Sequence, residues 1–139
     1  MVWVGMRIIV DTNLWISFLI SKKFTSFSAI IQSSNVELVL SDALIKEVLV
    51  TAARSKFHSL ISPEDIKRLK VLFSSIGTHI PTVETVKICR DPNDDFLLSL
   101  AISAGVDYLL TGDKDLLVLN KVRRTRIITY SEWIKLYEQ

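Results

Sequence analysis

The sequence is poor in the residues that mark disulfide-rich, loop-rich or irregular proteins. Its 139 residues include one cysteine, three prolines and four glycines. A single cysteine excludes an intramolecular disulfide. Cys89 lies in the apolar run VETVKIC, so it is expected to be a buried strand residue, and a lone thiol fits a reducing compartment. The scarcity of glycine and proline favours dense regular structure.

The sequence also lacks a long hydrophobic run. No apolar stretch approaches the roughly 20 residues needed to span a membrane, and the opening MVWVG is too short for a signal-peptide core. We therefore expect a soluble, cytoplasmic protein. A hydrophobic fraction of 49% excludes a disordered chain, and the length fits one domain over residues 1–139. Met6 is an alternative start, which would make residues 1–5 an upstream extension.

Apolar runs of strand length alternate with segments of helical periodicity. We expect strands at 7–10, 36–40, 85–89 and 107–111 with an edge strand at 126–128, and helices at 14–20, 26–33, 43–56, 62–77, 94–104, 115–119 and 131–137. Apolar strands separated by helices indicate an α/β fold whose mainly parallel sheet is covered on both faces. Right-handed crossovers make this a three-layer α/β/α sandwich, with ligands bound at the carboxyl ends of the strands.

Acidic residues follow three of the expected strands. Asp11 comes directly after the first strand, Asp94 and Asp95 follow the third, and Asp113 follows the fourth. Each of them could instead cap the next helix, since aspartate is a favoured helix N-cap. Capping does not explain why all of them fall at the same edge of the sheet, so their convergence favours a functional site.

Glu47 is a further acidic candidate. Within the expected helix its neighbours Ala43, Leu44 and Val50 are apolar, and only Thr51 is polar. A carboxylate on an apolar helix face is costly unless it is paired or binds a metal ion. A partly exposed surface acid is the alternative interpretation.

A cluster of carboxylates requires a cation, because the charges repel one another. Hard oxygen ligands suit Mg²⁺ or Mn²⁺, and the sequence has no cluster of histidine or cysteine that would indicate zinc. Such metal centres commonly activate water and stabilise an in-line phosphoryl displacement. The acidic pattern therefore predicts a metal-dependent nuclease.

Four segments resemble the PIN-domain family, in particular its small single-domain toxins of toxin–antitoxin pairs. They are RIIVDTN, SDALIKEV, CRDPNDDFLLSLAISAGVDYLLTGDKDLL and ITYSEWIKLYE. The resemblance implies a Mg²⁺- or Mn²⁺-dependent endoribonuclease that acts on RNA, forms a homodimer and is blocked by a small antitoxin protein.

The resemblance also implies an acidic quartet of Asp11, Glu47, Asp95 and Asp113. Asp95 is preferred to Asp94 because its spacing of 18 residues before Asp113 resembles the family pattern, and Asp94 is held as the alternative. The additional metal-ligand candidate is Asp115, and the supporting polar candidates, each also explicable as a capping residue, are Thr12, Asn13 and Thr111.

Charge is distributed in a way that favours a polyanionic substrate. The net charge is only +2, but setting aside Asp11, Glu47, Asp95, Asp113 and Asp115 leaves ten of the 15 acids against 17 bases. A basic surface around an acidic metal centre suits nucleic acid. The preferred contacts, because they lie close in sequence to the acidic edge, are Lys22, Lys23 and Lys114; the wider set includes Arg54, Lys56, Arg90, Lys121, Arg123, Arg124 and Arg126.

Two other functions fit part of the pattern. A receiver-like signalling module also binds Mg²⁺ in an acidic pocket, but it normally has its acidic pair after the first strand, and it would leave Glu47 without a role. A PIN-like protein that binds RNA without cleaving it is the second. Trp15 lies in an apolar stretch, so we expect it in the core rather than stacked on bases.

Overall fold

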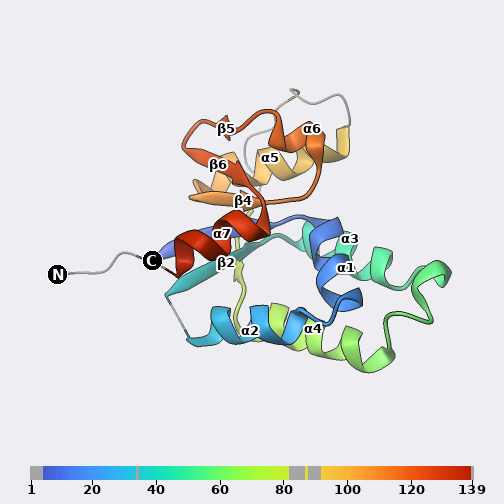
Figure 1. The fold of residues 1–139 in the computed structure, drawn as a ribbon. Helices are drawn as coiled ribbons and strands as arrows, with labels where there is room; N and C mark the ends of the chain where they lie inside the picture. The colour runs from blue at the N-terminus through green and yellow to red at the C-terminus, as the bar shows by residue number, and fades with distance from the viewer. Residues whose placement is uncertain (1–4, 34, 82–86, 88–91, 139) are drawn as a thin grey trace.

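A six-stranded sheet organises the computed structural model, which describes residues 5–33, 35–81, 87 and 92–138 (Figure 1). The strand order is β3-β2-β1-β4-β6-β5, and every neighbouring pair is parallel except β5 and β6. The strands are β1 (Met6–Val10), β2 (Val36–Leu40), β3 (Thr78–His79), β4 (Tyr108–Leu110), β5 (Lys121–Val122) and β6 (Thr125–Ile128). The central strands β1 and β4 are adjacent, so their carboxyl ends lie side by side.

Seven α-helices in the described residues complete an α/β/α sandwich, as the sequence predicted. They are α1 (Thr12–Ile20), α2 (Phe24–Ser33), α3 (Asp42–Ala52), α4 (Pro63–Ser75), α5 (Pro92–Ala104), α6 (Lys114–Leu117) and α7 (Tyr130–Tyr137), with a 3₁₀ helix at Ser55–Phe57. Figure 1 shows α2 and α4 lying side by side. No single helix in the described residues is long and apolar enough to cross a membrane; α1 and α2 meet the length and composition criteria only as a pair bent by 115°.

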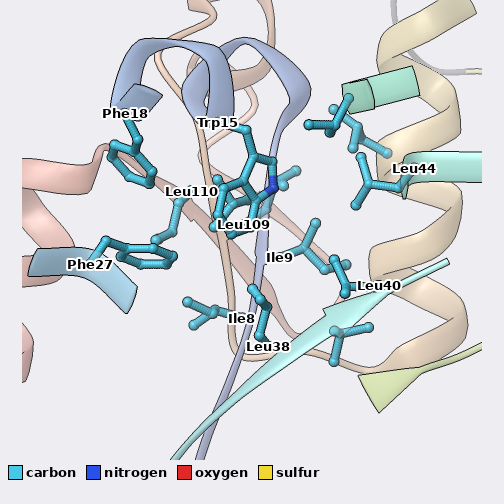
Figure 2. Packing of buried hydrophobic residues seen from close by; sticks show 14 of the residues in the cluster. Ile8, Ile9, Trp15, Phe18, Phe27, Leu38, Leu40, Leu44, Leu109 and Leu110 are labelled. Carbon is cyan, nitrogen blue, oxygen red and sulfur yellow. The ribbon is translucent and has the colours of Figure 1, made fainter. Parts of the chain in front are cut away.

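Aromatic side chains fill one half of the core. Trp15 of α1 is fully buried, as expected, and contacts the rings of Phe18, Phe27 and Phe73. Figure 2 shows Phe18 and Phe27 to one side of the strands and Leu44 of α3 to the other. Burial of large aromatic rings contributes strongly to stability, so α1 is held firmly against the sheet.

Some expected elements differ from the observed ones. The strand expected at the sheet edge, now β6, lies between β4 and β5, and β5 occupies the edge. The β5–β6 hairpin was missed because its turn contains Arg123 at φ 52° rather than the glycine or asparagine that signals such turns. The short β3 was also missed. The strand expected at 85–89 and the burial of Cys89 lie outside the described residues.

The helix expected to reach residue 56 ends at Ala52. Arg54 leaves the helical conformation, with φ −62° and ψ 142°, before the 3₁₀ helix begins. The end of α3 at Ala52 sets the position from which the Arg54 side chain leaves the backbone.

Candidate active site

Asp11 links the sheet to the first helix. Its backbone N–H still donates to the carbonyl of Leu110 on β4 at 3.1 Å, although β1 has ended. Its carboxylate caps α1 by accepting a hydrogen bond from the backbone N–H of Leu14 at 2.6 Å. Asp11 is only 4% exposed. It is therefore both a helix cap and a buried acid, so the two interpretations of the sequence are compatible.

Thr111 joins Asp11 to Asp113. The Thr111 side chain is 1% exposed, and its hydroxyl donates to the second carboxylate oxygen of Asp11. The same hydroxyl oxygen accepts a hydrogen bond from the backbone N–H of Asp113 at 3.0 Å. The carboxyl ends of β1 and β4 are thus fixed to each other through a buried threonine.

Glu47 reaches the same region from α3. The hydroxyl of Thr12, which is itself 5% exposed, donates to Glu47 Oε1 at 2.9 Å. Thr12 is the first residue of α1 and directly follows Asp11. The contact therefore carries Glu47 to the start of α1, next to the buried acid.

A cavity of about 220 Å³ collects these side chains with Asp94 of α5. It is lined by Asp11, Thr12, Asn13, Glu47, Thr51, Arg54, Asp94, Leu97 and Asp113. Four carboxylates from separate parts of the chain meet there; those of Asp11 and Asp113 follow β1 and β4, whereas Glu47 and Asp94 come from helices. Larger cavities exist between α2 and α4 and beside the 3₁₀ helix, but neither is lined by these acids.

Three of the acids have the spacing of a metal site. Carboxylate oxygens of Asp94, Asp113 and Asp115 lie within 4.8 Å of one another. Asp113 caps α6 by accepting a hydrogen bond from the backbone N–H of Asp115 at 2.9 Å, which fixes the two residues relative to each other. Carboxylate oxygens at this spacing fit a hard divalent cation such as Mg²⁺ or Mn²⁺.

Asp95, which the sequence spacing preferred, is not among the residues that line the cavity. Adjacent residues of a helix point about 100° apart. The orientation of α5 gives the inward position to Asp94, which is 7% exposed, and leaves Asp95 partly exposed. The geometry therefore favours Asp94, the alternative held from the sequence, over Asp95.

The electrostatics of the cavity favour a cation. Burial raises the pKa of the Asp11 carboxyl above its ordinary value of 3.8. The hydroxyl of Thr111 and the backbone N–H of Leu14 oppose this rise, whereas the nearby charges of Asp113 and Glu47 add to it. A bound cation would stabilise the ionised form of Asp11 against both burial and repulsion.

Sequence reasoning missed two residues of the cavity as site candidates, Thr51 and Leu97, and it included Arg54 only in the wider set of basic contacts. Thr51 and Arg54 follow Glu47 by four and seven residues, so helical periodicity places them on its face. Leu97 is likewise one turn after Asp94. The periodicity that places Thr51 and Leu97 beside the acids was therefore available in the sequence.

The lysines expected to contact nucleic acid do not line the cavity. Lys22 and Lys23 are exposed beyond the far end of α1, about 15 Å along the helix from Asp11. Lys22 forms an ion pair with Asp65 at 3.6 Å. Lys114 is exposed at the start of α6, beside Asp113, but it is not among the residues that line the cavity.

The fold and the acids together define an α/β protein with a carboxylate cluster suited to a divalent cation. A family model described as the PIN domain matches residues 7–115, and the chain belongs to the PIN-domain family. A search of curated proteins found no match. PIN domains are generally nucleases that use divalent metal ions, so membership implies nuclease-type activity on nucleic acid and replaces the receiver-like interpretation. The matched region contains all the acids of the cavity and ends before β5.

Proposed function

We propose that this protein is a Mg²⁺- or Mn²⁺-dependent endoribonuclease that hydrolyses phosphodiester bonds of RNA. The observation that carries the proposal is the meeting of Asp11, Glu47, Asp94 and Asp113 in one cavity of a PIN domain. Four carboxylates in such a space are unfavourable for stability alone, because they repel one another. A catalytic cation would offset this repulsion and would explain why the four carboxylates lie together.

The acids have different parts in this proposal. Asp94, Asp113 and Asp115 would hold the metal ion, since their oxygens have the required spacing. Asp11 and Glu47 add negative charge to the same cavity. When bound, the divalent ion supplies positive charge that stabilises the phosphoryl oxygens during displacement. Asp94 takes the place that the sequence spacing assigned to Asp95.

The polar neighbours keep the carboxylates in position. Thr111 donates to Asp11, and Thr12 donates to Glu47. Hydrogen bonds of this kind orient acidic ligands, and their loss commonly lowers metal affinity or activity. Asn13 is an exposed part of the cavity lining and has no comparable role in positioning an acid.

A toxin role, inhibition by a small antitoxin, homodimer formation and a cytoplasmic location complete the proposal. Their support is the resemblance to small single-domain PIN toxins. The neighbouring gene is the cheapest test, because toxins of this kind are encoded beside their antitoxins. A short reading frame there whose product inhibits cleavage by the purified protein would support the role, and its absence would remove that support.

Cleavage of RNA tests the chemistry. We expect purified protein to cut fluorescently labelled single-stranded RNA with Mn²⁺ and to lose this activity in EDTA. Asp11→Asn should abolish cleavage, whereas Asp65→Asn, which alters a buried aspartate outside the cavity, should retain it. A parallel arm with single-stranded DNA of the same sequence tests the preference for RNA.

The same experiment can overturn the proposal. Equal cleavage by the wild-type protein and Asp11→Asn would assign the activity to a contaminant or to another site. Binding of RNA without metal-dependent cleavage would favour the non-cleaving alternative. Cleavage of DNA in preference to RNA would retain the nuclease and replace its substrate.

A further inference from the structure

Of the described residues that line the acidic cavity, Arg54 is the cationic one. It enters the lining together with Thr51 and Glu47, on the same face of α3 and its extension. Lys67, Arg68 and Lys70 line other cavities, and Lys114, although beside Asp113, does not line this one. A positive group placed beside four carboxylates calls for an explanation.

The backbone of Arg54 is held at both ends. Its N–H donates to the carbonyl of Thr51 at 3.1 Å, and its carbonyl accepts a hydrogen bond from the N–H of Phe57 at 2.9 Å. Arg54 therefore connects the last turn of α3 to the 3₁₀ helix at a fixed place. Because the main chain is fixed, the start of the side chain is fixed as well, and only the guanidinium end is free to adjust.

Arg54 forms no direct ion pair with the described acids of the cavity. Within the described residues, its guanidinium forms no ion pair within 4.0 Å and no side-chain hydrogen bond, in contrast to Arg7, which binds Glu37 at 2.9 Å, and Arg124, which binds Asp107 at 3.2 Å. Arginine has five donors suited to bidentate binding of carboxylate or phosphate. A guanidinium at the cavity without a carboxylate partner leaves these donors available to an incoming anion.

We propose that Arg54 binds a phosphate of the nucleic-acid substrate and positions it against the carboxylate cluster, an inference that rests on the proposed nuclease function. A phosphodiester that approaches the acids alone is repelled. Arg54 provides the attraction at the cavity rim and sets which phosphate lies over the acids. Of the preferred lysine contacts, Lys22 and Lys23 lie too far along α1 to do this, and Lys114 does not line the cavity.

Binding without cleavage tests the inference directly. A short fluorescein-labelled single-stranded RNA is titrated with protein in EDTA, where the RNA stays intact, and fluorescence anisotropy is followed over a series of salt concentrations. The variants are Arg54→Gln, Arg54→Lys and the matched control Arg68→Gln, which removes the same charge from exposed α4 outside the acidic cavity.

Arg54→Gln should weaken RNA binding roughly tenfold and reduce the slope of log affinity against log salt by about 0.7, the value for one phosphate contact on a single strand. Arg54→Lys should keep the slope and recover part of the affinity, because it keeps the charge and loses the bidentate geometry. Arg68→Gln should behave as wild type. The melting temperature in EDTA should not fall in Arg54→Gln.

Three results would overturn the inference. Wild-type binding by Arg54→Gln, with cleavage intact, removes Arg54 from the substrate site and leaves the nuclease proposal standing. Equal losses in Arg54→Gln and Arg68→Gln indicate a general charge effect. A lower melting temperature for Arg54→Gln in EDTA, with unchanged RNA affinity, identifies Arg54 as a counter-ion of the acids. If the wild type binds RNA through Arg54 but cleaves nothing, only the nuclease proposal fails.

Discussion

Asp11 and Asp65 occupy similar local positions in two different parts of the molecule. Both are buried aspartates at the start of a helix, 4% and 9% exposed. Asp11 caps α1 at the carboxyl end of β1. Asp65 completes the capping box of α4: its carboxylate accepts from the N–H of Ser62 at 2.9 Å, and its own N–H donates to the Ser62 hydroxyl at 3.1 Å.

Their surroundings are opposite in charge. Around Asp65, Lys22 lies at 3.6 Å and Arg68 at 3.9 Å. The hydrogen bond from the Ser62 backbone is the largest cause that lowers the pKa of Asp65, and Lys22 adds to it. Around Asp11 the neighbours are acids, and burial raises its pKa. Both carboxylates receive hydrogen bonds, but the fold places cations beside Asp65 and acids beside Asp11, whose charge is therefore left unbalanced by its described neighbours.

The largest expected effect separates the two neighbouring acids of α5. Asp94→Asn should lower the rate of Mn²⁺-dependent cleavage by at least about 100-fold and weaken Mn²⁺ binding, because it removes a ligand oxygen. Asp95→Asn should stay close to wild type in both measurements. Cleavage kinetics and calorimetric titration with Mn²⁺ check this. If Asp95→Asn instead lost cleavage and Mn²⁺ binding while Asp94→Asn kept both, Asp95 would be the site residue and Asp94 a structural acid.

Asp65 should matter for stability and not for activity. Asp65→Ala removes the capping box of α4 and should cost about 1–2 kcal/mol in the free energy of unfolding. Urea denaturation measures this, with cleavage assayed well below the midpoint. Glu64→Ala is the control, since it removes an exposed acid from the same helix turn and should cost no more than about 0.5 kcal/mol. A large loss of activity in folded Asp65→Ala would break the contrast with Asp11.

The pH dependence of stability should have opposite signs at the two aspartates. Lowering of the Asp65 pKa stabilises the fold above the ordinary pKa of 3.8, and this stabilisation is lost as the pH falls through the lowered folded value. The raised pKa of Asp11 has the opposite effect. Its contribution to the stability of the fold is complete below pH 3.8 and is lost as the pH rises through the pKa of Asp11 in the folded protein.

Melting temperatures in EDTA should reveal this difference. As the pH rises from acidic to neutral, the melting temperature of Asp11→Asn should increase relative to that of the wild type. The melting temperature of Asp65→Asn should decrease relative to the wild type, and each change should be roughly 2–4 °C. Mn²⁺ at neutral pH should raise the melting temperature of the wild type more than that of Asp11→Asn, since a ligand stabilises the state that it binds. Parallel pH profiles for the two variants would contradict the comparison.

The smallest expected effect concerns the support of Glu47. Thr12→Val keeps the shape of the side chain and removes the hydroxyl that donates to Glu47. We expect a loss of about three- to tenfold in cleavage rate and a change in unfolding free energy of about 1 kcal/mol or less. Thr12→Ser keeps the donor and should retain activity. Equal losses in both variants would indicate packing rather than hydrogen bonding.

The sequence predicted most of what depends on local patterns. The apolar run at Val36–Leu40 coincides with β2, and Asp11 and Asp113 lie at strand ends as expected. These features follow from periodicity and from the parallel topology. The α/β/α architecture was predicted for the same reason, and the family was predicted from the resemblance of the four quoted segments, which include β1 from Arg7 and the whole of β4.

What could not be predicted depends on orientation in space. Asp94 and Asp95 are equivalent in a linear pattern, and only the packing of α5 decides which one faces the cavity. Arg54 was one of ten basic residues named as candidate contacts, and only the packing of the chain brings it into the lining of the acidic cavity. The pairing of Thr12 with Glu47 connects residues 35 apart in sequence, a relation that no local signal contains.

The two hydrogen bonds through the Thr111 hydroxyl also point in one direction. A threonine hydroxyl has a single proton, and that proton is donated to Asp11, while the oxygen accepts from the N–H of Asp113. The relay therefore runs one way, from an amide through a hydroxyl to a carboxylate, and aligned dipoles of this kind reinforce one another. The negative end of this chain of hydrogen bonds is always the carboxylate of Asp11. Serine could preserve this polarity; valine would leave an amide and a buried carboxylate without their shared partner.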